Sequence, residues 1–123
     1  MIAYVRSTGI TVSDQDKAID FYVNKLGFEL RSDLPMGEGM RWVEVAPPGA
    51  QTLLILMKGY GETEGRLGKF ANIVFEADDI QATYETLKDR GVHFTEPPTS
   101  QSWGRKQALF VDQDGNGFVL VGQ

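Results

Sequence analysis

The chain has 123 residues, a hydrophobic fraction of 41% and a formal net charge of −5, which predicts one compact domain or two small modules sharing a core. It contains no cysteine, so disulfides and thiolate catalysis are excluded and a reducing, cytoplasmic location is favoured. No apolar run approaches the roughly 20 residues that span a bilayer. Because lysine and arginine are not clustered, we expect neither a nucleic acid nor a membrane as partner. The acidic balance suits a cationic or neutral ligand.

Residues 2–12 alternate loosely between apolar and other side chains, which predicts a β-strand. One face of this strand is apolar, and the other carries the small residues Ser7, Gly9 and Thr11. Small polar residues on a strand indicate either a solvent-facing surface or the wall of a cavity, and the residues alone leave both interpretations open.

An amphipathic helix is predicted at residues 15–26, where apolar residues recur at helical spacing. Asp14 precedes the helix and can accept hydrogen bonds from the unpaired N–H groups of its first turn. Gly27 follows the last periodic residue, where glycine adopts a left-handed C-cap without steric cost. Three strands follow, predicted at residues 28–32, 40–45 and 52–57. A loop at residues 33–38 and a Pro-Pro-Gly turn separate them.

The second half of the chain repeats this order. Strands are predicted at residues 70–77, 92–95, 107–111 and 118–121, with a helix between the first two, a loop at 96–100 and a tight turn at 112–117. Asp78 or Asp79 is the expected N-cap, and Gly91 ends the helix, about 64 positions after Gly27.

The two modules, residues 1–57 and 70–123, are joined by residues 58–69, which contain four glycines. This segment is interpreted as a linker, with a mobile lid that uses Tyr60 as its aromatic contact as the alternative. Because one module alone would leave a sheet half covered, the modules should combine. The sequence therefore predicts an α+β fold, in which two βαβββ modules in tandem form a curved eight-stranded mixed sheet around a concave cavity, with the helices outside.

The stretches VSDQDKAIDFYVNKLGFEL, FEADDIQATYETLKDRGVHF and FVDQDGNGFVLV give the chain a family resemblance. It resembles the vicinal oxygen chelate superfamily, which includes glyoxalase I, extradiol dioxygenases, fosfomycin-resistance enzymes and bleomycin-resistance proteins. The resemblance implies the fold described above and a homodimer, in which the modules pair within one chain or are exchanged between chains.

The resemblance also implies where a divalent metal would be held in the enzymes of this superfamily. The four ligand positions fall at Ser7, at Leu53 or Ile55, at Asn72 and at Val119, none of which carries His, Asp or Glu. Because divalent metals need imidazole or carboxylate donors, we expect no metal and no other cofactor. The single histidine, His93, is interpreted as a surface strand residue.

No nucleophile–base arrangement is recognisable, so catalytic residues stay unknown. The expected ligand site combines tryptophans that can stack on a flat or cationic molecule, arginines that could meet a ligand carboxylate or pair on the surface, and polar groups that orient the ligand. The predicted ligand-binding residues are Ser7, Thr11, Arg41, Trp42, Tyr60, Asn72, Trp103, Arg105 and Gln107.

Three functions follow from these observations. The favoured one is a dimeric, metal-independent protein that binds a small molecule such as an antibiotic or a metabolite. The alternative is a lyase, isomerase or dioxygenase that uses a displaced metal site or none. It stays open because the sequence does not place Glu44, Tyr60, Glu62, Glu64 and Glu76, of which Glu76 could serve as a general base if it reaches the pocket. The third is an interaction domain with a vestigial cavity.

Overall fold

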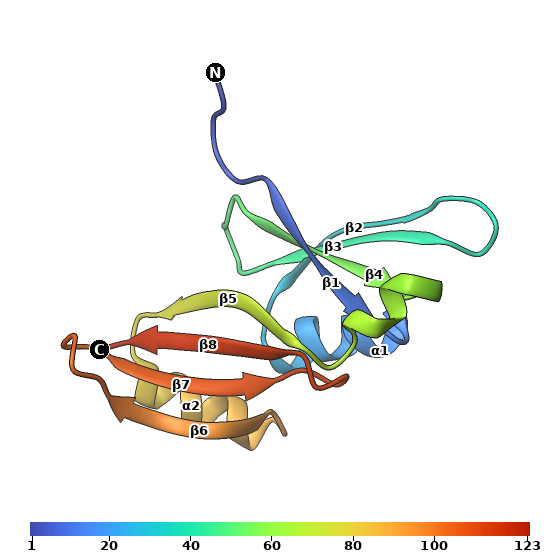
Figure 1. The fold of residues 1–123 in the computed structure, drawn as a ribbon. Helices are drawn as coiled ribbons and strands as arrows, with labels where there is room; N and C mark the ends of the chain where they lie inside the picture. The colour runs from blue at the N-terminus through green and yellow to red at the C-terminus, as the bar shows by residue number, and fades with distance from the viewer. The chain divides into compact units, whose positions relative to one another are not determined.

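The computed structural model describes residues 1–123 except for the side chain of Glu62, so Glu62, one of the residues named for the enzyme alternative, lies outside the described side chains. The chain divides into two compact units, residues 1–67 and 68–123. Figure 1 shows the first unit in blue to green and the second in yellow to red.

The first unit is a four-stranded mixed sheet with the order β1-β4-β3-β2. β1 and β4 are parallel, and the other neighbours are antiparallel. Its elements are β1 Ser7–Val12, α1 Gln15–Ile19, η1 Asp20–Lys25, β2 Glu29–Pro35, β3 Arg41–Ala46, β4 Leu53–Lys58 and η2 Gly61–Arg66.

The first helix begins where the sequence predicts and changes type halfway. Asp14 is the N-cap, and its carboxylate accepts a hydrogen bond of 3.0 Å from the backbone N–H of Lys17. The second half, η1, is a π-helix rather than the expected α-helix. Phe21 and Tyr22 are consecutive, yet both are buried with their rings edge to face, and the wider turn accommodates them. Gly27 ends the helix with a φ of 80°.

The second unit repeats the plan with the order β5-β8-β7-β6 and a parallel β5–β8 pair. Its elements are β5 Phe70–Ala77, α2 Ile80–Asp89, β6 His93–Ser100, β7 Lys106–Val111 and β8 Gly117–Gly122. Asp79 is the N-cap of α2. Phe110 and Phe118 are buried in the core, and Phe75, Phe94 and Phe118 all have ring centroids within 6.2 Å of that of Phe110.

Both units therefore have the βαβββ order, and the predicted α+β class is confirmed. The eight strands are hydrogen-bonded as two four-stranded sheets. Loops at equivalent places in the two units contain Gly49 and Gly115, with φ angles of 76° and 81°, as the internal repeat leads us to expect.

Several predicted boundaries are wrong. β1 starts at Ser7, and the preceding arm, residues 1–6, is exposed. β2 continues to Pro35, and β6 continues to Ser100, through segments predicted as loops. Both are edge strands, where a proline is tolerated because its missing N–H can lie on the side that has no neighbouring strand. The register shifts within β6 also accommodate its two prolines. The expected linker contains the 3₁₀-helix η2, Gly61–Arg66.

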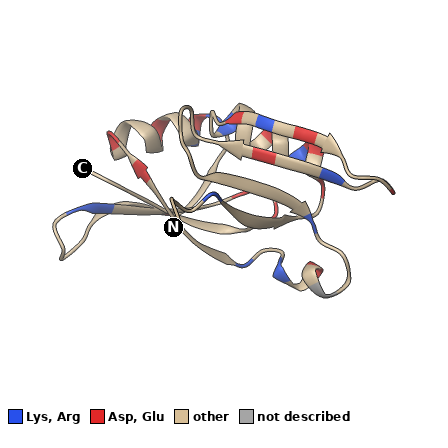
Figure 2. Ribbon diagram, turned by 90° about the horizontal axis from the view of Figure 1, so that it is seen from above, with Lys and Arg blue, Asp and Glu red and all other residues tan. Residues whose placement is uncertain are grey.

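Charged positions of both signs are interspersed along the chain, as the ribbon coloured by charge makes visible (Figure 2). None of the helices in the described part of the chain is long and apolar enough to cross a membrane.

The aromatic cluster of the second unit provides a test of the core. Phe110→Ala should lower the free energy of unfolding by about 3–5 kcal/mol, because it leaves a cavity among buried rings. Denaturant unfolding measures this loss. Phe70→Ala is the matched control, since the side chain of Phe70 is 53% exposed, and it should cost less than about 1 kcal/mol. Equal losses for the two variants would contradict the assignment of the core.

Candidate functional site

The first unit contains a cavity of about 440 Å³. It lies where β1 and β4 end and β3 begins, so three strand ends supply its wall. The residues that line it are Thr11, Gln15, Met36, Met40, Arg41, Trp42, Met57, Lys58, Tyr60 and Thr63.

The pairing of the strands places the side chains of this wall. Thr11 on β1 lies directly opposite Met57 on β4. Trp42 alternates along β3 with the fully buried Val43, so the indole points away from the core of the unit. Met36 and Met40 come from the β2–β3 hairpin and are joined by a backbone hydrogen bond of 2.8 Å.

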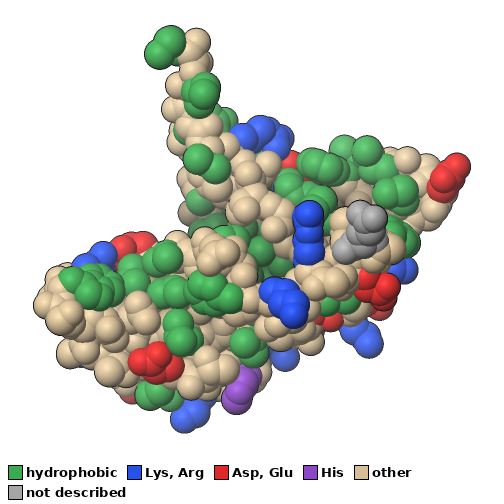
Figure 3. Space-filling view, viewed as in Figure 1, with side chains coloured by type: hydrophobic (Ala, Val, Ile, Leu, Met, Phe, Trp, Pro, Cys, Tyr) green, Lys and Arg blue, Asp and Glu red, His purple; other side chains and the backbone are tan. Residues whose placement is uncertain are grey.

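Apolar and aromatic groups dominate the cavity wall. Met36, Met40, Trp42 and Met57 are all partly exposed, with relative exposures of 60%, 49%, 37% and 37%. Hydrophobic side chains reach the surface along the N-terminal arm and over the β2–β3 hairpin (Figure 3). Methionine side chains are flexible and polarisable, so such a wall adapts to the shape of an organic molecule.

A buried carboxylate lies on the same strand as the tryptophan. Glu44 is 5% exposed and shares the face of β3 with Trp42. Burial raises the pKa of Glu44, but hydrogen bonds donated by Trp42, Arg6 and Ser32 outweigh that effect and lower the pKa. Glu44 is therefore ionised at neutral pH, and its charge is balanced by Arg6 at 3.1 Å.

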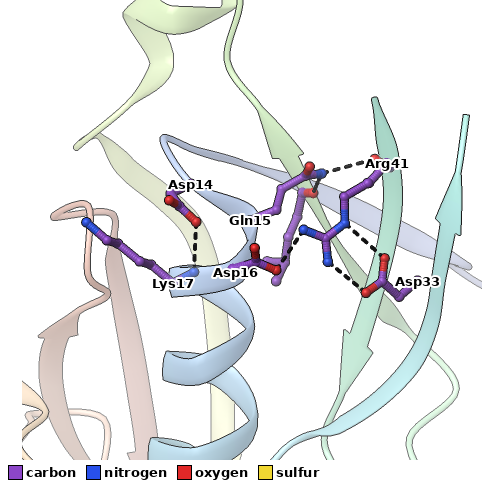
Figure 4. Close-up of polar contacts among 7 residues, drawn as sticks. Asp14, Gln15, Asp16, Lys17, Asp33 and Arg41 are labelled. Atoms are coloured by element: carbon purple, nitrogen blue, oxygen red, sulfur yellow. Dashed lines mark hydrogen bonds and ion pairs between the residues drawn. The ribbon is translucent and has the colours of Figure 1, made fainter. Parts of the chain in front are cut away.

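Arg41 ties three elements together beside the cavity (Figure 4). Its Nε and Nη2 atoms donate to the two carboxylate oxygens of Asp33 on β2, at 3.1 and 2.7 Å. Its Nη1 donates to Asp16 on α1 at 2.7 Å. The side-chain amide of the buried Gln15 donates to the backbone oxygens of Arg41 and Leu56, at 3.0 and 2.9 Å. These contacts fix the start of α1 to β3 and β4.

The ion pairs shift the pKa values of both partners. Hydrogen bonds from Arg41 lower the pKa of Asp33, and hydrogen bonds to Asp33 and then Asp16 raise the pKa of Arg41. Arg41 thus lines the cavity while its guanidinium is bound to two carboxylates of this chain. The sequence predicts that Arg41 either binds a ligand carboxylate or forms a surface ion pair, and the structure contains the ion pair.

A polar recess of about 210 Å³ shares residues with the cavity. It is lined by Ser13, Asp14, Gln15, Asp16, Gly39, Arg41 and Lys58. The ammonium group of Lys58 lies 5.5 Å from the centroid of the Tyr60 ring, a distance at which a cation is attracted to the face of an aromatic ring. The site therefore combines an apolar wall with a charged margin.

Of the nine residues predicted to bind a ligand, the structure brings Thr11, Arg41, Trp42 and Tyr60 together at this cavity. Ser7 lies at the opposite end of β1, paired with Leu53, and does not line it. The sequence reasoning missed Gln15, Met36, Met40, Met57, Lys58 and Thr63. One feature of the sequence could have indicated these residues: three of the four methionines occur between residues 36 and 57, and methionine-rich surfaces are typical of adaptable binding sites.

The remaining predicted residues belong to the second unit. Trp103 is exposed, and Gln107 lies opposite Val121 on the neighbouring strand. Arg105 donates hydrogen bonds from both Nη atoms to the carboxylate of Glu76, and these bonds lower the pKa of Glu76. Like Arg41, Arg105 is therefore already engaged with a carboxylate of its own unit.

Asn72 has an unusual backbone. Its φ of 59° lies in the left-handed region, which asparagine tolerates better than other residues with a side chain. The register between β5 and β8 shifts around it, between Phe70 and Val74. Asparagine at this position is thus explained by the backbone conformation that the irregular pairing requires.

The residues at the metal-ligand positions implied by the family resemblance do not fit a divalent ion. In the first unit, Ser7 lies opposite the aliphatic Leu53, and in the second unit Val119 lies opposite Val74. A hydroxyl, an amide and aliphatic groups are not donors that such ions select. Among the side chains that the structure describes, no group of three or more His, Cys, Asp or Glu could hold a metal. His93 is exposed on β6.

The Arg41–Asp33 pair predicts a specific dependence of stability on pH. Because the pKa of Asp33 is lowered by folding, its stabilisation is present above the ordinary value of 3.8 and is lost as pH falls through the folded value. Wild type should therefore melt at a higher temperature than Asp33→Asn at about pH 6, and the difference should shrink as the pH falls below 3.8. Melting curves of both proteins across this range measure the effect.

Asp78→Asn is the control for this measurement, because the exposed Asp78 has no ion pair among the described side chains. It should change the melting temperature little at any pH. A difference between wild type and Asp33→Asn that persists unchanged at the acid end would contradict the role of the carboxylate.

Comparison with known proteins agrees with this architecture. A member of the glyoxalase/bleomycin resistance protein/dioxygenase superfamily from Sphaerobacter thermophilus superposes with a TM-score of 0.91 and 48% identity, over 99% of this chain and 98% of that one. TnmS3, an antibiotic binding protein from a Streptomyces species, superposes with a TM-score of 0.85 and 38% identity, over 98% of this chain and 96% of that one.

An enzyme relative is more distant. A probable lactoylglutathione lyase from Synechocystis is 28% identical over 96% of this chain and 94% of its own length. Residues 2–120 match the Glyoxalase/Bleomycin resistance protein/Dioxygenase superfamily. With the repeated βαβββ units, these matches identify the chain as a member of that superfamily.

Proposed function

We propose that this protein binds a small, largely apolar organic molecule, an antibiotic or a metabolite, in the cavity of the first unit, and that it does so without a metal ion. The observation that carries the proposal is the cavity wall of Trp42, Met36, Met40 and Met57. A volume of about 440 Å³ falls in the range of small-molecule pockets, which are mostly apolar with a few polar groups.

The position of the indole supports stacking as the main contact. Trp42 lies on the same face of β3 as the buried Glu44 and lowers the pKa of that carboxyl group, while part of its ring surface is exposed at the cavity, where a flat ligand can bind against it. The three methionines would adjust to the edges of that ligand. Thr11, Gln15 and Thr63 supply polar atoms at the wall.

Two further observations support a metal-independent binding role. The donor groups of Ser7 and Asn72 are poor ligands for divalent ions. TnmS3, which shares 38% of its residues with this chain, is an antibiotic binding protein. Binding of an organic molecule by stacking and apolar contact needs no metal, and we expect affinity to be the same before and after treatment with EDTA.

The two tryptophans make the proposal testable by fluorescence. In Trp103→Phe the only indole is Trp42 at the cavity, and in Trp42→Phe the only indole is Trp103. Titration with the uncharged planar compound 2-naphthamide, and separately with the planar antibiotic daunorubicin, should give saturable quenching of Trp42 for a compound that binds. Trp42→Ala should weaken binding about tenfold or more, as expected for a buried aromatic contact.

Trp103→Ala tests the predicted role of Trp103 with the same titration. Saturable quenching of Trp103 alone, with no effect of Trp42→Ala on affinity, would contradict the assignment of the ligand to the first unit. No quenching and no change in melting temperature across a broad panel of antibiotics and aromatic metabolites would overturn the binding function.

A second candidate function is a lyase, and the 28% identity to a probable lactoylglutathione lyase favours it. Two of the residues named for this alternative are already engaged: Glu44 is buried among donors and Glu76 is bound by Arg105. Both have lowered pKa values, which suits an ion-pair partner better than a general base near neutral pH.

An assay with the hemithioacetal of methylglyoxal and glutathione separates the two functions. We expect no turnover with the purified protein, with or without added Ni²⁺ or Zn²⁺. Metal-dependent turnover that is lost on Glu44→Gln would establish the enzyme instead. The homodimer and the cytoplasmic location stay predictions from the sequence, and light scattering of the purified protein measures the first of them.

A further inference from the structure

The cavity has two cationic side chains, and they differ in what else they contact. Arg41 and Lys58 both line the cavity and the adjoining polar recess. If the cavity binds an organic molecule, as proposed above, these two residues set the charge that the molecule can carry. Their contacts with the rest of the chain therefore bear on the class of ligand.

Arg41 is not available as an anion receptor. Nε and Nη2 bind both oxygens of Asp33, and Nη1 binds Asp16, each at 3.1 Å or less. A guanidinium has five N–H donors in a planar fork, and here both of its edges are turned to carboxylates. A ligand carboxylate at Arg41 would displace one of these partners or add a third negative charge beside them.

Lys58 has a different environment. It is exposed and has no carboxylate within ion-pair distance among the side chains that the structure describes. Asp14 lines the same recess, and its pKa is lowered mainly by the hydrogen bond from the backbone N–H of Lys17 and also by the charge of Lys58, which acts on it from beyond ion-pair distance. The Lys58 ammonium instead lies over the ring of Tyr60.

The position over Tyr60 has a consequence for cationic ligands. The face of an aromatic ring attracts one cation, and here Lys58 is already at 5.5 Å from its centroid. A cationic ligand would have to displace the ammonium and would be repelled by it. An anionic group at the same margin would meet the Lys58 ammonium, for which the described side chains supply no carboxylate within ion-pair distance and Asp14 only a longer-range attraction.

We propose that the occupant of the cavity is an aromatic molecule that carries a negatively charged group, such as a carboxylate or a phenolate, and that Lys58 rather than Arg41 recognises that group. The aromatic part lies against Trp42 and the methionines. This reverses the charge preference that the acidic balance of the whole chain favours, because the local environment of the cavity margin decides the interaction and the net charge does not.

Three naphthalenes of the same size test the proposal by calorimetry: 2-naphthoate, 2-naphthamide and 2-naphthylmethylammonium. Wild type should bind the anion about fivefold more tightly than the amide, the order expected for one partly exposed charge pair, and the cation most weakly. Salt at about 0.5 M should reduce the preference, since exposed charges are screened.

The variants Lys58→Met and Lys58→Arg assign the preference to one side chain. Lys58→Met keeps most of the apolar stem and should bind naphthoate and naphthamide equally, whereas Lys58→Arg should retain the preference. Lys88→Met is the matched control, because Lys88 also lies over a tyrosine, with its ammonium 5.6 Å from the ring of Tyr84 on α2. It should leave all three affinities unchanged.

The outcomes separate this proposal from the proposed function. If naphthamide and naphthoate bind equally to wild type and Trp42→Ala weakens both, the binding function stands and the anion preference is wrong. If the preference survives Lys58→Met, Lys58 is not the recognising residue and the proposal is overturned. If none of the three compounds binds and the antibiotic titrations also fail, the binding function itself falls. Equal melting temperatures of the variants exclude misfolding as the cause.

Discussion

The ion pairs of Arg41 are the contacts on which the candidate site depends. A helix start, a hairpin and a strand end meet at this residue, through Asp16, Asp33 and the amide of Gln15. Without them, the start of β3 would lose its side-chain links to α1 and β2, and the β3–β4 register pairs only Glu44 and Val45 with β4. A cavity between strand ends needs such ion pairs, because loops and hairpin tips are otherwise mobile and hold their side chains in no defined position.

The two units share one topology, but their side chains serve different purposes. Each has a parallel pair between its first and last strands and a helix between the first two strands. In the first unit the strand ends open onto a methionine-rich cavity. In the second, the described core is a cluster of phenylalanines, and Arg105 pairs with Glu76. A duplicated fold can thus keep its backbone while the side chains at corresponding places diverge, which is why membership of a superfamily does not fix a function.

Charge at the site is a local property. The chain carries a net charge of −5, yet the Lys58 ammonium at the cavity margin has no carboxylate within ion-pair distance among the described side chains. The charges of Arg41 and Glu44 are balanced within the protein: Arg41 pairs with Asp16 and Asp33, and Glu44 pairs with Arg6. Screening confines each charge to about one Debye length, so the nearest groups decide what a ligand meets.

The sequence by itself determined the fold class, the repeat, the first N-cap and the glycine that ends the first helix, because periodicity and capping are local properties of the chain; it left the second N-cap between Asp78 and Asp79, and the structure has Asp79. It also placed four residues of the cavity among the candidates. Only the tertiary structure decided that the β2–β3 hairpin supplies Met36 and Met40, that β2 runs on to Pro35, and that Arg41 is bound to two aspartates. Those facts depend on strand register and on pairs far apart in sequence, which no local pattern encodes.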